Sequence, residues 1–160
     1  MAIYICSHKL FAKYLVKNGE ILAFSLGTRE EQTEKQLLKI RNFHKLPGSL
    51  IESEELDREF NKKIHEKLKY NHNFINDLGI YKFVRVYKEL LTLNLGETIS
   101  YKELASKTKL SIPLVVRALK YNPFPILIPC HRVIRSDGSL SGYTPLGPEF
   151  KKLLLDLERK

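Results

Sequence analysis

The chain has few cysteines, few acidic residues and no long apolar run. No stretch approaches the roughly 20 apolar residues that span a bilayer, so no membrane-spanning helix and no membrane partner are expected. The first residues, MAIYICSHKL, lack a basic segment followed by an apolar core, which argues against a secretory signal peptide. We therefore expect a cytoplasmic protein, which would be associated with the nucleoid in a prokaryote.

Only two cysteines are present, Cys6 and Cys130. A reducing compartment keeps such residues as thiols, and a chain of 160 residues can form a stable core without a disulfide bond. We expect no structural disulfide, which leaves both thiols available for chemistry.

The shortage of acidic residues gives the chain a net charge of +9, from 27 Lys and Arg against 18 Asp and Glu. Such an excess favours a polyanionic partner, with nucleic acid ahead of an acidic membrane surface. Solubility alone is the other interpretation of the charge.

The first half of the chain has the pattern of a mixed α/β unit. Asn18-Gly19 lies between two apolar runs and predicts a β-hairpin, because both residues tolerate positive φ angles. Helical spacing follows over residues 29–43 and 53–69, and Ser53 is a suitable N-cap for the second helix. The second helix carries an apolar stripe at i, i+4 spacing: Leu56, Phe60, Ile64 and Leu68.

Polar turn-forming residues interrupt the periodicity over 70–79, and we place a domain boundary there. Residues 1–75 are predicted to form an α/β domain, a small sheet plus helices in a ribonuclease H-like arrangement. Residues 76–160 are predicted to form a mostly helical domain.

Helix signals are dense in this second half. A helix is predicted from Tyr81 to Gly96, and Ser100 with Glu103 forms a capping box for the next one. Ser111 opens a further short helix that Pro123 stops. Two short helices with a short connection favour a helix-turn-helix, although many helical hairpins merely pack together.

Basic and aromatic residues gather at the end of the second short helix, where Arg117, Lys120 and Tyr121 suit contact with a phosphate backbone. The last segment, 147–160, is amphipathic and predicts a C-terminal helix. Its apolar face consists of Phe150, Leu153, Leu154 and Leu157, which leaves open whether Glu158 points inward.

The run YNPFPILIPCHRV, residues 121–133, carries three prolines that fix their own φ angles and push the preceding residues toward extended conformations. We expect residues 122–129 to be stiff, extended and buried by their apolar side chains. Asn122 could then clamp the backbone groups that this segment leaves unpaired.

Cys130 and His131 follow directly. A thiol reacts as its thiolate, and a neighbouring base can generate that anion. Adjacent residues of an extended chain point to opposite faces, so contact between these two needs a sharp turn or a bridging water. The dipeptide alone is also compatible with a small buried hydrophobe beside a hydrogen-bonded histidine.

The segment PILIPCHRV, residues 125–133, resembles the signature of the O6-alkylguanine-DNA alkyltransferases, the suicide DNA-repair proteins. The resemblance runs from about residue 74 to the end and includes GETISYKELA, ALKYNP, the GY at 142–143 and KKLLLDLE. The first half matches only as a general α/β layout.

The resemblance implies that an alkylated guanine is flipped out of double-stranded DNA, since its reactive group cannot be reached in the base stack. The Cys130 thiolate would take the alkyl group irreversibly, in a single turnover. By the same resemblance, His131 would act as the base through a water, Glu158 would orient it, Tyr101 would protonate the departing guanine, and Asn122 would hold the turn before the thiol. A monomer without a cofactor is implied.

The resemblance also assigns binding residues. The guanine pocket would be lined by Pro125, Val133, Tyr143 and Thr144. The helix over 111–121 would lie in the minor groove. The DNA contacts would come from Lys82, Ser100, Arg117, Lys120 and Tyr121.

Two departures from the family pattern bear on these roles. The family carries an arginine nine residues before the asparagine, which fills the gap left by the flipped base, and this chain has Pro113 there. Arg117, four residues later on the same helix face, would compensate in part. The interval from Tyr143 to Glu158 is one residue longer than in the family. An extra residue in a loop is easily tolerated. An extra residue inside the helix would instead rotate Glu158 away from His131.

Some family members bind zinc in the N-terminal half. Here Cys6 and His8 are close in sequence, but no second Cys/His pair has suitable spacing, so no metal is expected. Three other functions remain open: a non-catalytic protein that binds alkylated DNA, a Cys-His hydrolase, and a helix-turn-helix regulator.

Overall fold

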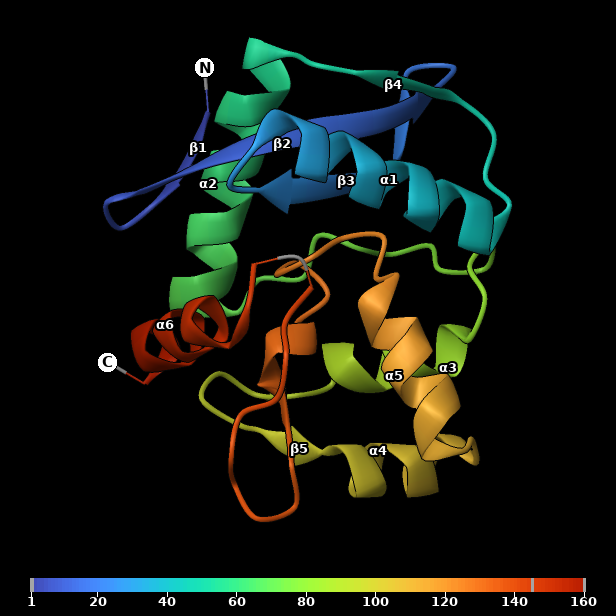
Figure 1. The fold of residues 1–160 in the computed structure, drawn as a ribbon, viewed down its shortest axis with the longest axis vertical. Coiled ribbons are helices and arrows are strands. Elements are labelled where there is room, and N and C mark those ends of the chain that lie inside the picture. Colours follow the sequence, from blue (N-terminus) through green and yellow to red (C-terminus); the bar gives the residue numbers. More distant parts are fainter. Residues whose placement is uncertain (1, 145, 160) are drawn as a thin grey trace.

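The computed structural model describes residues 2–144 and 146–159 and shows a small mixed α/β protein (Figure 1). The first half of the chain forms a small antiparallel sheet and two long helices. Its elements are β1 (Ile3–Ile5), β2 (His8–Lys17), β3 (Glu20–Gly27), α1 (Glu30–His44), β4 (Ser49–Ile51) and α2 (Glu54–Tyr70).

The β-hairpin predicted at Asn18-Gly19 is confirmed. These two residues join β2 to β3 with φ angles of 52° and 79°, the left-handed conformation that this dipeptide accepts at low cost. β1 and β4 also pair antiparallel with β2, near its beginning and near its end. β2 is therefore the strand on which the sheet is built.

Alternate residues of β3 face the two helices. Phe24 contacts Phe60 of α2, with ring centroids 4.8 Å apart, whereas the hydroxyl of Ser25 donates to the carbonyl of Thr33 in α1 at 2.6 Å. Because successive side chains of a strand point to opposite faces, α1 and α2 cover opposite faces of the sheet. The Ser53 cap predicted for α2 is confirmed, since its hydroxyl accepts from the Leu56 amide at 3.2 Å.

The second half of the chain is mostly helical. Its elements are α3 (Val84–Leu91), β5 (Ile99–Ser100), α4 (Tyr101–Thr108), α5 (Ile112–Lys120), the short 3-10 helix η1 (Cys130–Arg132), β6 (Val133–Ile134) and α6 (Pro148–Glu158). β5 and β6 form a two-residue parallel pair that joins the start of α4 to the segment after η1.

The predicted starts of two helices are confirmed. The Ser100 hydroxyl accepts from the Glu103 amide at 3.0 Å, and the Ser111 hydroxyl accepts from the Leu114 amide at 3.4 Å. Lys109, with φ of 59°, ends α4, so only a few residues separate α4 from α5. The helix predicted over 81–96 is wrong at both ends, because α3 spans only Val84–Leu91.

The early end of α3 has a local cause. The Thr92 hydroxyl donates to the carbonyl of Glu89, and the Asn94 amide donates to the Glu97 carboxylate at 2.9 Å. Gly96 has a φ of 81°, which is outside the helical range. These side chains and this glycine favour a turn, which competes with continuation of the helix.

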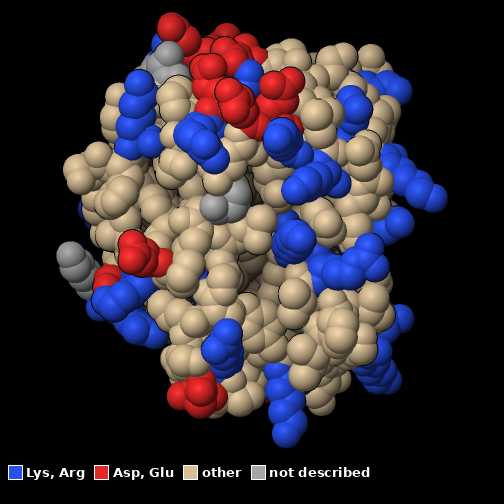
Figure 2. Space-filling view, in the orientation of Figure 1, with Lys and Arg blue, Asp and Glu red and all other residues tan. Residues whose placement is uncertain are grey.

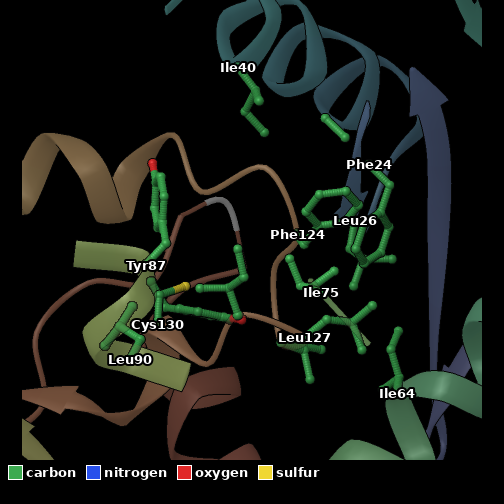
Figure 3. Packing of buried hydrophobic residues seen from close by; sticks show 14 of the residues in the cluster. Phe24, Leu26, Ile40, Ile64, Ile75, Tyr87, Leu90, Phe124, Leu127 and Cys130 are labelled. Atoms are coloured by element: carbon green, nitrogen blue, oxygen red, sulfur yellow. The ribbon is translucent and has the colours of Figure 1, made fainter. Parts of the chain in front are cut away.

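One apolar core joins the two halves. Figure 3 shows Phe24 and Leu26 of β3 beside Ile75 and beside Phe124 and Leu127 of the second half. The Phe24 amide also donates to the carbonyl of Pro123 at 2.9 Å. The segment that leads to Cys130 is therefore fixed directly to the sheet.

Within residues 2–144 and 146–159, no helix is both long and apolar enough to cross a membrane.

Candidate active site

Asn122 organises the turn before the cysteine. Its side-chain amide donates to the carbonyl of Ile128 at 2.8 Å, and its side-chain oxygen accepts from the amide of Phe124 at 3.0 Å. Asn122 is buried, so these bonds satisfy backbone groups that water does not reach. The geometry is the clamp that the sequence predicts.

The expectation that residues 122–129 are extended is wrong at Ile126. This residue has a φ of 72°, and the Ile128 amide donates to the carbonyl of Phe124 at 2.8 Å, which closes a turn. The left-handed region is costly for a β-branched residue, so the surrounding packing must hold it there. Ile126 is fully buried.

Cys130 begins the 3-10 helix η1 and lines a cavity of about 550 Å³. Its side chain is only 7% exposed, and residues of α5 line the same cavity. Sites for small molecules commonly measure about 300–1,000 Å³, so an aromatic base fits the available volume. Other polar and aromatic residues that line the cavity with the thiol include Tyr101, Arg135, Ser141, Tyr143, Thr144 and Lys151.

Burial raises the pKa of the Cys130 thiol, and several neighbours oppose this effect. The Asn122 side chain, the charge of Lys151 and the Tyr143 hydroxyl each favour the thiolate. The net direction is upward, so the resting group is a protonated thiol that needs a base. Within the described residues, the Tyr143 hydroxyl is buried and has no hydrogen-bond partner.

His131 and Glu158 form a buried pair beside the thiol. His131 Nε2 donates to Glu158 Oε1 at 2.9 Å, and both side chains are fully buried. The extra residue between Tyr143 and Glu158 does not misplace the carboxylate, because α6 begins only at Pro148 and its last residue, Glu158, still reaches His131. The structure therefore answers the question that the sequence left open: Glu158 points inward.

The apolar face expected for α6 needs a correction that follows from this orientation. The buried residues of the helix are Phe150, Lys151, Leu154, Leu155 and Glu158. Leu153 and Leu157, which the sequence pattern placed in the apolar face, are only half-buried. The helix is rotated so that it presents a lysine and a glutamate to the interior.

Burial lowers the pKa of His131, while the hydrogen bond from the imidazole to Glu158 opposes this. Burial would raise the pKa of Glu158, but His131 and Arg132 outweigh that effect and hold it at about 2. The pair is thus a neutral imidazole beside a carboxylate. Because Nε2 carries the proton, Nδ1 has a free lone pair, and no described residue hydrogen-bonds to it.

Sequence reasoning missed Arg132, which anchors the carboxylate. Its Nε lies 3.1 Å from both Glu158 oxygens, and its Nη2 donates to Glu158 Oε2 at 2.5 Å and to Asn71 Oδ1 at 2.9 Å. Nη1 donates to the carbonyl of Leu93 at 3.1 Å. Lys67 of α2 is also buried in this group, and burial together with the Arg132 charge lowers its pKa to about 8. The Glu158 carboxylate therefore contacts a group that is held by residues from both halves of the chain.

Lys151 was also missed by the sequence reasoning, which predicted an amphipathic helix and asked only whether Glu158 points inward. Its ammonium lies 3.4 Å from the Ser141 hydroxyl and 5.6 Å from the ring centre of Tyr101. Burial lowers the pKa of Lys151, and the Cys130 charge opposes that shift. The Tyr101 hydroxyl shares a short hydrogen bond with Ser141.

The predicted pocket residues divide into two groups. Tyr143 and Thr144 line the cavity with Cys130. Val133 is fully buried in β6, where it pairs with Ile99, and Pro125 is buried and lines a smaller pocket together with Cys130. Neither of these two contributes to the wall of the main cavity.

The predicted DNA contacts lie near the cavity, but their positions differ. Lys120 lines the cavity, whereas Arg117 has its guanidinium 5.4 Å from the ring centre of Phe43 in α1. Tyr121 stacks on the same Phe43 ring, and Lys82 lies 5.4 Å from it. The Ser100 hydroxyl is used as the cap of α4.

His44 of α1 is a further residue that the sequence did not single out. Its Nδ1 accepts from the Lys82 amide at 3.0 Å, so its Nε2 donates to the Tyr121 carbonyl at 2.8 Å. Burial lowers its pKa to about 4, which keeps the ring neutral. Gln36 of α1 donates to the carbonyl of Lys120 at 2.9 Å. Helix α1 thus holds the end of α5 directly before Asn122.

No group of three or more His, Cys, Asp or Glu residues in the described part of the chain is arranged to hold a metal ion.

Comparisons with known proteins agree with this site. Residues 82–160 match the family model described as the DNA-binding domain of 6-O-methylguanine DNA methyltransferase. Over 74 residues the chain is 45% identical to the methylated-DNA–protein-cysteine methyltransferase of Methanothermobacter thermautotrophicus, which covers 46% of this chain and 42% of that protein. Over 93 residues it is 41% identical to the protein of the same name from Thermococcus kodakarensis, covering 55% and 52%. The chain spans about half the length of the curated relatives it matches.

Solved structures extend the likeness to the whole fold. The O6-methylguanine-DNA methyltransferase from Pyrococcus kodakaraensis covers 99% of this chain and 96% of its own, with a TM-score of 0.76 and 24% identity. The Mycobacterium tuberculosis OGT in complex with DNA covers 61% and 63%, with a TM-score of 0.50 and 33% identity. Residues 82–160, about half of the chain, are therefore similar to the DNA-binding domain of the 6-O-methylguanine DNA methyltransferases, and the fold of the whole chain is similar to that of a solved member.

Proposed function

We propose that this protein repairs DNA by moving the alkyl group of O6-alkylguanine to Cys130, once per molecule. The observation that carries the proposal is a thiol on the wall of a base-sized cavity, directly followed by the buried His131–Glu158 pair. A thiol that served only as a small core residue would not need a buried base whose free nitrogen lacks a partner.

The transfer begins with removal of the thiol proton. His131 Nδ1 is the available acceptor, and a bridging water carries the proton from Cys130 to it, as the family resemblance implies. Glu158 stabilises the imidazolium that forms, because its carboxylate already accepts the Nε2 proton. The ammonium of Lys151 favours the thiolate through its charge.

The thiolate then attacks the alkyl carbon. A carbon–sulfur bond forms as the bond between that carbon and guanine O6 breaks, and the electron pair of the broken bond stays on the guanine. Tyr101 lines the cavity and supplies a proton to the departing base. The product thioether has no leaving group that water displaces readily, so the protein is consumed.

DNA is the partner that the surface favours. Figure 2 shows Lys and Arg gathered around a hollow on the face that α1 and α5 form in Figure 1. The mouth of the cavity carries Lys102, Lys120 and Arg135. Exposed Lys35 and Lys39 of α1 line a neighbouring groove that shares Thr144 with the cavity. Such a surface suits a phosphate backbone.

We assign α4 and α5 to a helix-turn-helix with α5 in the minor groove. This assignment is supported by their two serine caps and their short connection. A ribonuclease H-like first domain over 1–75, a second domain over 76–160, a monomeric state and a cytoplasmic location remain predictions.

A repair assay with two cysteine variants tests the function. The protein is incubated with a labelled duplex that contains one O6-methylguanine, and the loss of the methyl group from DNA is followed. Cys130→Ser should abolish repair, because a hydroxyl is far less nucleophilic than a thiolate, whereas Cys6→Ser should repair like the parent, since Cys6 is exposed and outside the cavity.

Two results would overturn the proposal. Repair by Cys130→Ser would show that the thiol is not the acceptor. Binding of the modified duplex without any transfer by the parent protein would favour a non-catalytic lesion-binding protein.

A further inference from the structure

Helix α5 exposes an apolar face at the mouth of the cavity. Ile112 is 45% exposed and Val116 is 43% exposed. They are four residues apart and therefore lie on the same side of the helix. Both line the cavity that contains Cys130.

This apolar face has no role in the core. The buried residues of α5 are Val115 and Ala118, so Ile112 and Val116 lie outside the buried face of the helix. A single exposed apolar residue needs no explanation, but two together on a surface otherwise rich in lysine and arginine mark a contact. Pro113 lies beside them in the first turn of α5 and is also exposed.

Arg117 does not occupy this position. Its guanidinium lies over the Phe43 ring of α1, and Arg117 is not among the residues that line the cavity. The partial compensation for Pro113 that the sequence suggested is therefore not what the side-chain arrangement favours. Of the four α5 residues that line the cavity, Ile112, Val116 and Leu119 are apolar and Lys120 is basic.

We propose that Ile112 and Val116 form an apolar wedge that enters the base stack beside the target nucleotide and fills the space it leaves. This inference rests on the proposed function, because it needs a base that leaves the duplex. Proteins that bind the minor groove insert apolar side chains between base steps, and the wedge offsets the cost of unstacking. Lys102, Lys120 and Arg135 around the same mouth complement the phosphates on either side of such a step.

The wedge predicts a loss that depends on the substrate. Ile112→Ala combined with Val116→Ala should slow methyl transfer from duplex DNA by about tenfold or more, because no side chain then fills the space that the extruded nucleotide leaves in the base stack. Transfer from free O6-benzylguanine should be unchanged, since no base stack has to open. Alanine has a higher helix propensity than isoleucine and valine, so α5 should still form.

The control replaces two apolar residues that are exposed elsewhere. Ile80 and Leu95 are 51% and 37% exposed and lie outside the cavity. Ile80→Ala combined with Leu95→Ala removes similar apolar surface and should leave transfer from the duplex as in the parent. Ile112→Leu combined with Val116→Leu keeps apolar bulk and should retain most of the rate.

A fluorescent base reports extrusion directly. In a Cys130→Ser background, which prevents transfer, 2-aminopurine placed next to the modified guanine should brighten on binding, and the double alanine variant should lose most of that increase. Affinity for the duplex and its salt dependence should change little, because the phosphate contacts remain.

The outcomes separate the wedge from the proposed function. Absence of transfer by the parent protein from both substrates would refute the function itself. Normal transfer by the parent, with equal duplex rates for the double alanine variant, would refute only the wedge. An equal loss on duplex and free base would also refute it, because it would indicate a damaged cavity.

Discussion

Replacing Glu158 by glutamine perturbs the buried charge group behind the thiol with almost no change in shape. The amide oxygen of glutamine can still accept a hydrogen bond from His131. Arg132, however, is fully buried and would lose the only carboxylate that contacts it within the described residues. The variant therefore removes the negative charge of Glu158 and leaves the guanidinium of Arg132 unpaired in the protein interior, where the dielectric constant is low.

The magnitude follows from the pKa of Glu158, which the fold lowers from 4.5 to about 2. A tenfold change in an acid dissociation constant corresponds to about 1.4 kcal/mol, so the carboxylate contributes roughly 3 kcal/mol to the free energy of unfolding at neutral pH. Removal of one partner of a buried ion pair costs about 3–5 kcal/mol, which agrees with this value.

The sign of the pH dependence is fixed by the lowered pKa. A carboxyl group with a lowered pKa in the folded state stabilises the protein above its unfolded-state pKa, and this contribution is lost as the pH falls through the folded-state pKa. For Glu158 that window runs from 4.5 down to about 2. The advantage of the parent protein over Glu158→Gln should therefore shrink across this range.

Urea unfolding of both proteins, at neutral pH and at several values inside that window, measures the difference. Glu20→Gln is the matched control, because Glu20 is exposed at the start of β3 and its loss should change stability by less than about 0.5 kcal/mol. A loss below about 1 kcal/mol at neutral pH would refute the reasoning. So would a difference between parent and variant that does not depend on pH.

Three further outcomes follow from the same geometry. Arg117→Ala should weaken duplex binding and its salt dependence while leaving transfer from free O6-benzylguanine unchanged, and equal losses in both assays would count against a phosphate contact. The transfer rate from the free base should keep rising past pH about 8.5, because burial raises the pKa of Cys130 above that of an ordinary thiol; a plateau at lower pH would contradict this. His44→Phe should lower the free energy of unfolding by about 2 kcal/mol or more, since the Tyr121 carbonyl and the Lys82 amide both lose a buried partner, and an unchanged urea midpoint would argue against that role.

The sequence predicted those features of the fold that have local causes. Asn18-Gly19 fixes the hairpin through its own backbone preferences, and Ser53, Ser100 and Ser111 accept bonds from amides three residues ahead. Asn122 clamps a segment only a few residues away. In each case the partners lie within one or two turns of chain.

Long-range features could not be predicted in this way. The direction of Glu158 depends on how α6 packs against η1, and an amphipathic pattern does not fix the helix rotation when Lys151 and Glu158 are both buried. Arg132 and His44 have partners 26 and 77 residues away, and only the fold brings them together. A charged or polar residue that becomes buried looks like a surface residue until its partner is known.

The central claim is tested most directly by mass spectrometry of the protein after reaction with excess duplex that carries O6-methylguanine. We expect one methyl group per protein molecule, located on the peptide that contains Cys130, with the amount of repaired guanine equal to the amount of protein. Repair that exceeds one guanine per protein molecule, or a methyl group on any residue other than Cys130, would contradict the account.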